Sequence, residues 1–207
     1  MRPLPRLHAY TDATLLADPT LGIRAAAIAA GGPSVALHAR APGQTAAFLT
    51  AAAARLLALA RPPEAAVLVN GRSDIAAGLG ANGVQLGRDD IRPADARRVM
   101  NHGWIGCSVH SQEEAEEAAR HGADFVVVGS VYPTASHPGW PAAGLDLVRE
   151  VSALGLPVIA IGGITAERAW EVQSAGAYGV AAIGALWRAP DPAAATLALL
   201  EPWSGDQ

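Results

Sequence analysis

The chain has 207 residues, of which 51% are hydrophobic and only 16% are charged, so its composition excludes an intrinsically disordered protein. The net charge of −4, without any basic run, gives no attraction to nucleic acid or to an anionic membrane, and we expect a small-molecule partner instead. Cys107 is the only cysteine, which excludes an internal disulfide and a cysteine-cluster metal site. None of the 15 basic residues is a lysine, which excludes lysine Schiff-base chemistry.

The amino terminus, "MRPLPRLHAYTD", has no long apolar stretch, and the most apolar window, "TAAAARLLALA", is short and interrupted by Arg55. A membrane helix needs about 18 or more apolar residues in succession. We therefore expect neither a secretion signal nor a membrane helix, and a cytoplasmic protein. The length lies near the lower limit of an α/β barrel, roughly 200 residues, and predicts one domain over residues 1–207.

Short apolar runs alternate with longer segments rich in alanine and charge, which is the signature of βα units that build a parallel sheet. The expected strands are 6–11, 34–39, 65–70, 83–86, 104–109, 123–129, 157–162 and 179–184. The clearest helix between them is "SQEEAEEAARHG", with Ser111 as N-cap, Glu114 three residues later and Gly122 as the stop. This series of units predicts a (β/α)₈ TIM barrel, with a doubly wound sheet of fewer strands as the main alternative.

Polar and small residues follow the expected strands at their carboxyl ends, which is where a TIM barrel binds its ligand. Those that we expect to contact a substrate are His38, Arg40, Asn70, Arg72, Gln85, Ser108, Thr134 and Ser136. Each alone has an ordinary reading as a turn or cap residue, but together they would form one ring. Thr134 and Ser136 belong to the longest connection, 129–144, whose prolines, glycines and hydroxyls suit an active-site flap.

Two glycine-bearing segments, "AIGGI" and "AAIGA", end the seventh and eighth expected strands. Glycine lets a backbone approach an anion closely, and the N–H groups at a helix start carry partial positive charge. The loops after these two strands are also the recurrent phosphate site of TIM barrels. We therefore expect a phosphate at Gly162, Gly163, Ile183 and Gly184, with plain turns as the alternative.

Five segments carry a resemblance to a known family: "LVNGRSDIA", "GVQLGRDD", "IGCSVHSQEEA", "GADFVVVGSVYPTASHPG" and "PVIAIGGIT". Together, in order and over nearly the whole chain, they resemble the thiamine phosphate synthase/TenI superfamily. The resemblance implies a (β/α)₈ barrel with one of two activities of thiamin biosynthesis. A synthase joins a pyrimidine diphosphate to a thiazole phosphate, whereas a TenI-like tautomerase aromatises a carboxylated dihydrothiazole phosphate.

The synthase pattern implied by the resemblance is incomplete in this chain. That pattern has Gln-x-Arg-x-Lys at the end of strand two, an Asn-Asp pair after strand three, an Asp after strand four and a lysine in the flap. The corresponding positions here read Ala36, His38 and Arg40, then Asn70 and Gly71, then Asp90, and finally His137. A departing diphosphate needs cations, and the chain lacks several of them together with one magnesium carboxylate.

The segments "NGR", "VQL" and "SVHS" instead resemble the tautomerase branch, in which His110 would correspond to the proposed acid/base. His110 would then shuttle a proton near neutral pH without a metal or another cofactor. A capping or packing histidine is the alternative reading. We expect a thiazole tautomerase, an isomerase acting on a thiazole phosphate. The alternatives are a thiamine phosphate synthase and a non-catalytic protein that binds thiazole or thiamin phosphates, and the sequence leaves a homo-oligomer open.

Overall fold

The computed structural model of the chain describes residues 2–60, 64–134, 139 and 141–205. Its parallel strands form a closed barrel in which each strand pairs with its neighbours in chain order and the last pairs with the first. They are β1 (Leu7–Tyr10), β2 (Val35–Ala39), β3 (Ala66–Asn70), β4 (Gly83–Leu86), β5 (Trp104–Val109), β6 (Phe125–Gly129), β7 (Val158–Ile161) and β8 (Gly179–Ala182). The predicted (β/α)₈ TIM barrel is confirmed.

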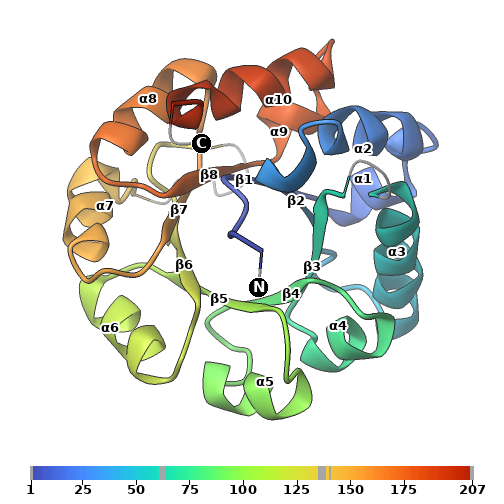
Figure 1. Cartoon of the computed structure of the whole chain (residues 1–207), viewed down its shortest axis with the longest axis horizontal. Coiled ribbons are helices and arrows are strands. Elements are labelled where there is room, and N and C mark those ends of the chain that lie inside the picture. The colour runs from blue at the N-terminus through green and yellow to red at the C-terminus, as the bar shows by residue number, and fades with distance from the viewer. Residues whose placement is uncertain (1, 61–63, 135–138, 140, 206–207) are drawn as a thin grey trace.

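Helices surround the barrel and cover its outer face (Figure 1). They are α1 (Ala13–Ala17), α2 (Leu21–Ala29), α3 (Ala46–Leu59), α4 (Ser73–Leu79), α5 (Pro93–Val99), α6 (Gln112–Arg120), α7 (Gly144–Ser152), α8 (Ala166–Ser174), α9 (Gly184–Trp187) and α10 (Pro192–Leu200), with 3₁₀ turns η1 (Gly32–Ser34) and η2 (Glu201–Trp203). Within the described residues, no helix is both long and apolar enough to cross a membrane.

The expected elements differ from the observed ones mainly at their ends. β8 stops at Ala182, before the expected end at residue 184, because the short helix α9 begins at Gly184. Helix α6 begins as predicted, since the Ser111 hydroxyl accepts a hydrogen bond from the Glu114 N–H at 3.2 Å. Gly122, with a φ of 82°, follows its C-cap residue His121.

Side chains alternate along each strand between two apolar layers, because a strand repeats every two residues. On β3, Val67 and Val69 belong to the cluster that packs against the helices, while Ala66 and Leu68 belong to the cluster inside the barrel. The inner row of β3 continues to Asn70, at the carboxyl end. The last inward side chain of each strand is therefore what the barrel presents at its mouth.

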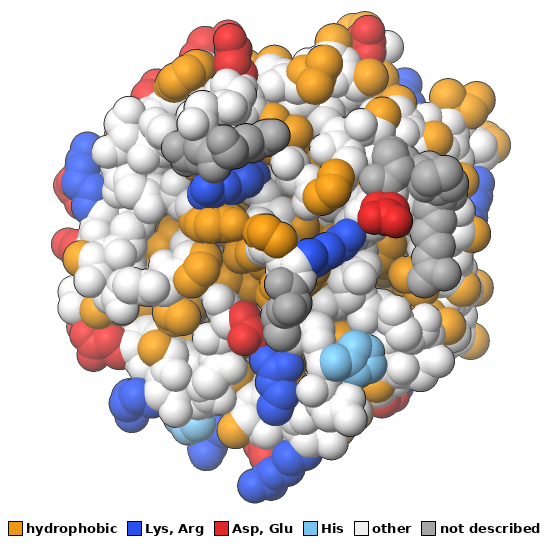
Figure 2. All heavy atoms as spheres, in the orientation of Figure 1, with side chains coloured by type: hydrophobic (Ala, Val, Ile, Leu, Met, Phe, Trp, Pro, Cys, Tyr) orange, Lys and Arg blue, Asp and Glu red, His pale blue; other side chains and the backbone are white. Residues whose placement is uncertain are grey.

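The segment before β1 closes the opposite end of the barrel, where the strands begin (Figure 1). Leu4 packs on the inner apolar cluster, and its carbonyl accepts a hydrogen bond from the Tyr178 hydroxyl at 2.7 Å. The guanidinium groups of Arg2 and Arg6 lie over the rings of Trp104 and Tyr178. Figure 2, in the same orientation, shows arginine side chains next to apolar surface on this face. A ligand therefore has to enter at the carboxyl ends of the strands.

Candidate active site

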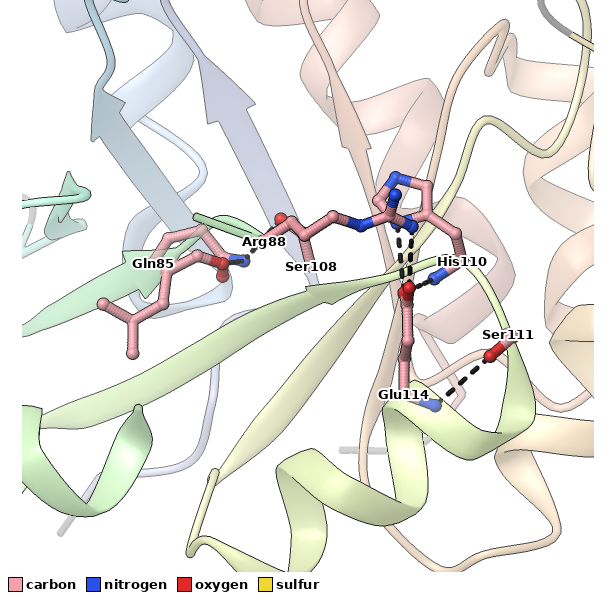
Figure 3. Close-up of polar contacts among 7 residues, drawn as sticks. Gln85, Arg88, Ser108, His110, Ser111 and Glu114 are labelled. Atoms are coloured by element: carbon pink, nitrogen blue, oxygen red, sulfur yellow. Dashed lines mark hydrogen bonds and ion pairs between the residues drawn. The ribbon is translucent and has the colours of Figure 1, made fainter. Parts of the chain in front are cut away.

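The inward rows of β2 to β5 end in polar side chains, His38, Asn70, Gln85 and Ser108, and the structure brings these four predicted residues together. The His38 ring nitrogen Nδ1 lies 3.0 Å from the Asn70 amide, and Asn70 pairs with Gln85 in the strand register. The Gln85 amide donates to the Ser108 hydroxyl at 3.2 Å (Figure 3). The four side chains therefore form a continuous polar arc, in which Asn70 and Ser108 are half-buried at the mouth while His38 and Gln85 are buried behind them, so His38 does not reach the mouth surface as predicted.

Gln85 is buried, and its side-chain oxygen Oε1 has no hydrogen-bond partner in the described part of the chain. The oxygen fills the space in front of Gly106, because a Cβ at Gly106 would lie 2.3 Å from it. A buried carbonyl without a partner costs about 1–3 kcal/mol. Any side chain at position 106 would therefore displace the Gln85 oxygen. That oxygen remains an acceptor without a partner in the polar arc.

Beneath Asn70 lies a group of buried rings that sequence reasoning missed in part. His8 Nδ1 lies 2.8 Å from His38 Nε2, and the Tyr10 ring stacks on His38 with centroids 4.0 Å apart. Burial lowers the pKa of His8 to about 4, and burial together with His8 lowers the pKa of His38 well below its usual value, so both rings are neutral at pH 7. His8 and Tyr10 are two residues apart in an apolar strand, so their side chains lie on the same face. That spacing could have identified them as a pair inside the barrel.

Two predicted arginines occupy different surroundings. Arg40 follows β2 directly, and its positive charge contributes to lowering the pKa of His38 and opposes the rise in the pKa of Tyr10 that burial causes. Arg72 is tied to Asp74 on α4, with its Nε donating to Oδ1 at 2.8 Å. Arg40 therefore acts on the buried rings through its charge, whereas Arg72 is held by Asp74 at the start of a helix.

At the ends of β3 and β4, Asp90 is the carboxylate nearest to Gly71. Its oxygens lie 3.2 Å from the position that a Cβ at Gly71 would take, and Oδ2 accepts a hydrogen bond from the Gly87 N–H at 2.7 Å. The described residues hold no group of three or more His, Cys, Asp or Glu side chains that would bind a metal ion. One carboxylate beside bare backbone does not fit a magnesium site built from two carboxylates.

His110 faces the start of α6 (Figure 3). Its backbone N–H donates to a Glu114 carboxylate oxygen at 2.7 Å, and its ring Nδ1 lies 3.3 Å from the same oxygen. Arg88 donates to the other oxygen of Glu114 at 2.6 Å. The ring is 42% exposed and lines a cleft shared with Asp146 on α7. This geometry fits the capping reading of His110.

The two glycine-bearing segments meet at the neighbouring ends of β7 and β8. Gly162 and Gly163 have φ values of 101° and 65°, and a Cβ on Gly162 would lie 2.6 Å from the Cβ of Ser130. Gly184 begins α9 after the N-cap residue Ile183, and among the described residues no atom beyond its chain neighbours and its own helix lies within 4 Å of the position of a Cβ there. The first two glycines are therefore required by packing, while Gly184 faces open space.

An arginine that the sequence reading missed lies at this same corner. Arg168 donates to the Gly163 carbonyl at 2.6 Å, and its guanidinium lies 4.4 Å from the centre of the Tyr132 ring. Thr134 is half-buried in the loop after β6, whereas Ser136 and His137 lie outside the described residues. Of the predicted flap residues, the structure therefore describes Thr134 but neither Ser136 nor His137.

A closed (β/α)₈ barrel with polar side chains at its mouth and glycines after β7 and β8 places the protein in the class of TIM-barrel proteins. The profile of the thiamine monophosphate synthase (TMP-TENI) family matches residues 7–186. The chain belongs to this family, so the predicted superfamily is confirmed.

Relatives and a solved structure are similar to the chain at several degrees of coverage. A thiamine-phosphate synthase of Salinispora tropica is 39% identical over 206 residues, which cover 97% of this chain and 98% of that protein. One of Roseiflexus castenholzii is 47% identical over 150 residues, 70% of this chain, and the match spans 65% of the relative's length. A thiamine phosphate pyrophosphorylase from Pyrococcus furiosus superposes with a TM-score of 0.81 at 32% identity, covering 95% of this chain and 94% of that one.

These comparisons contradict the predicted thiazole tautomerase and the isomerase class. Several relatives that match at 39–47% identity are named thiamine-phosphate synthase, which is a transferase. The prediction rested on the incomplete synthase pattern and on the three segments "NGR", "VQL" and "SVHS", which are short compared with the similarity along the whole chain. The role of His110 as the proton shuttle of a tautomerase is withdrawn with that activity, and its ring contacts Glu114 at the helix start.

Proposed function

We propose that this protein is a transferase of the thiamine-phosphate synthase type, joining a pyrimidine diphosphate to a thiazole phosphate with release of diphosphate. The observation that carries the proposal is the Salinispora relative, which bears that name and matches 97% of this chain. A match of that extent includes the strand ends that line the mouth. Small phosphate-bearing molecules are accordingly the proposed partners.

The polar arc supports a substrate site at the mouth. We assign Asn70 and Ser108 to direct substrate contact, since both end inward rows and are only half-buried. Gln85 lies between them and holds Ser108 by a hydrogen bond of 3.2 Å. Thr134 of the flap would add a hydroxyl donor, and Ser136, which lies outside the described residues, stays a prediction.

The corner after β7 and β8 is the proposed phosphate site, formed by Gly162, Gly163, Ile183 and Gly184. The open space in front of Gly184 supports this assignment, because an anion needs room beside the backbone N–H groups. Arg168, held on the Gly163 carbonyl, adds positive charge close by. We assign the phosphate of the thiazole substrate to this corner.

Departure of diphosphate requires positive charge near the leaving oxygens. The chain has no lysine, so arginines are its only side chains with a permanent positive charge. Arg40 is the arginine whose charge reaches Tyr10 and His38 inside the barrel. We therefore assign the diphosphate end of the substrate to Arg40.

The test mixes the purified protein with pyrimidine diphosphate and thiazole phosphate, with and without magnesium, and measures diphosphate and thiamin phosphate together. Arg40→Gln should lower kcat/KM about 100-fold, because it removes a charge that stabilises the leaving group. Arg72→Gln is the matched control, since Arg72 is held by Asp74 outside the arc, and it should stay near the wild-type rate. Absence of both products in the wild type, or equal rates of the two variants, would contradict the proposal.

A further inference from the structure

A line of hydrogen bonds runs through the barrel interior from its closed end to Asn70, and the proposed function assigns it no role. The His8 Nε2 lies 3.1 Å from the Pro5 carbonyl, His8 Nδ1 lies 2.8 Å from His38 Nε2, and His38 Nδ1 lies 3.0 Å from the Asn70 amide oxygen Oδ1. Both histidines are 0% exposed. Neither ring therefore touches a ligand at the mouth, and any effect of the rings on a ligand passes through Asn70.

Both rings must be neutral for reasons that the geometry supplies. A buried imidazolium needs a carboxylate or another acceptor of its charge. Among the described residues, the hydrogen bonds and ion pairs bring no carboxylate to either ring, and Arg40 adds a positive charge near His38. A second proton on either ring would therefore be strongly unfavourable.

Neutral rings give the line of hydrogen bonds a single direction. A carbonyl oxygen only accepts, so His8 carries its hydrogen on Nε2 and donates it to Pro5. The bare Nδ1 of His8 then accepts from His38, which places the hydrogen of His38 on Nε2. His38 Nδ1 is bare in consequence, and it faces Asn70 as an acceptor.

Asn70 therefore has to donate a hydrogen bond from its NH₂ group to the bare Nδ1 of His38. The structure places the amide oxygen Oδ1 of Asn70 3.0 Å from His38 Nδ1, where two acceptors would face one another if Nδ1 carries no hydrogen. A half-turn of the amide puts the NH₂ group there and turns the oxygen toward Tyr10. The buried Tyr10 hydroxyl has no other hydrogen-bond partner among the described residues, so the same half-turn satisfies it.

We propose that His8 and His38 are positioning residues that hold the Asn70 amide with its NH₂ group toward His38 and its oxygen toward Tyr10. The remaining amide hydrogen of Asn70 is then fixed for an anionic oxygen of the substrate diphosphate at the mouth. The identity of that ligand rests on the proposed function. The direction of the hydrogen bonds does not depend on it.

The first test measures ring tautomers by ¹⁵N NMR of the wild-type protein with labelled histidine, at pH 7. His8 and His38 should both carry hydrogen on Nε2 and none on Nδ1. The two signals are assigned by their loss in His8→Gln and His38→Gln among the six histidines of the chain. A hydrogen on His38 Nδ1 would overturn the proposal, because the Asn70 amide would then face the other way.

The second test removes the constraint on the His38 tautomer without changing Asn70 itself. His8→Phe removes the acceptor of His38, so His38 should no longer carry its hydrogen on Nε2 alone. The Kd for pyrophosphate, and the KM for pyrimidine diphosphate, should rise about 3- to 10-fold, because only a fraction of the molecules keeps the competent amide orientation. His8→Gln should retain wild-type values, since its amide oxygen accepts from His38 and its NH₂ group donates to Pro5.

Phe125→Leu is the control for packing, because the Phe125 ring contacts the His8 ring with centroids 5.4 Å apart but belongs to no hydrogen bond of the line. It should leave the His38 tautomer and the Kd for pyrophosphate unchanged. An unchanged Kd in His8→Phe with an altered His38 tautomer would overturn the positioning role.

If His8→Phe does not fold, Tyr10→Phe replaces it, and it should weaken pyrophosphate binding while the tautomers of His8 and His38 stay unchanged. Failure of the wild type to form product or bind pyrophosphate would refute the proposed function. The tautomers of His8 and His38 would still test the direction of the hydrogen bonds independently.

Discussion

Gly162→Ala is expected to lower the free energy of unfolding by about 2–5 kcal/mol. A φ of 101° costs an L-residue about 1–2 kcal/mol. The new Cβ would lie 2.6 Å from the Cβ and 2.7 Å from the Cα of Ser130, and overpacking of this kind costs about 1–3 kcal/mol. Ser130 follows β6 directly, so relief requires movement of the loop base or of the end of β7. Thermal unfolding should show a melting temperature lower by about 4–20 °C.

Two other glycines separate the contributions. Gly122 has a φ of 82° with no atom within 4 Å of an added Cβ, so Gly122→Ala should cost the backbone strain alone, about 1–2 kcal/mol. Gly184 has neither positive φ nor a close atom, and Gly184→Ala should change stability by less than about 0.5 kcal/mol. The same methyl group would stand in the proposed phosphate corner, so the KM for thiazole phosphate should rise. Equal melting temperatures for Gly162→Ala and Gly184→Ala would refute the packing argument.

Three further predictions follow from the caps and the buried rings. The folded pKa of His8, about 4, lies below its ordinary 6.5, so the unfolded chain binds the proton first and stability falls by about 3 kcal/mol as pH drops through that window. Urea unfolding between pH 6.5 and 5 should show this slope, and an equal slope in His8→Gln would contradict it. Ser111→Ala should cost about 1 kcal/mol in urea unfolding, because the Glu114 N–H loses its acceptor, and no loss would show that the cap contributes nothing. His110→Asn should keep the wild-type condensation rate, measured by diphosphate release, and a rate about 100-fold lower would return His110 to the chemistry.

The fold could be predicted because the apolar strand runs, the helix caps and the alternation of the two all indicate repeated βα units. The expected strands "GVQL" over 83–86 and "WIGCSV" over 104–109 match the observed β4 and β5, since short, mainly apolar runs between polar helices are typical of buried parallel strands. Strand ends were less certain. The expected eighth strand ended at residue 184, two residues past the observed end at Ala182. The segment "IGAL" is apolar and small, so its composition does not distinguish the end of a strand from the start of α9.

The inside of the barrel could be predicted only in part, because a polar residue in an apolar strand does not reveal its partners. His38, Asn70, Gln85 and Ser108 were identified from their places at strand ends. His8 lies early in its strand and was taken as part of the run, although it bonds to His38. Contacts between strands depend on the shear of the closed barrel, which no single strand contains.

The segment "SVHSQEE" shows why a local motif gave the wrong chemistry. A histidine just past a strand end has two positions available, one toward the mouth and one toward the following helix. Glu114 decides between them, because its carboxylate accepts from the backbone N–H of His110 while Arg88 holds its other oxygen. The capping box that predicted the start of α6 therefore also draws His110 toward the helix, since one acceptor serves both its backbone and its ring. The residue that the motif marked for proton transfer is the one that the helix start already uses.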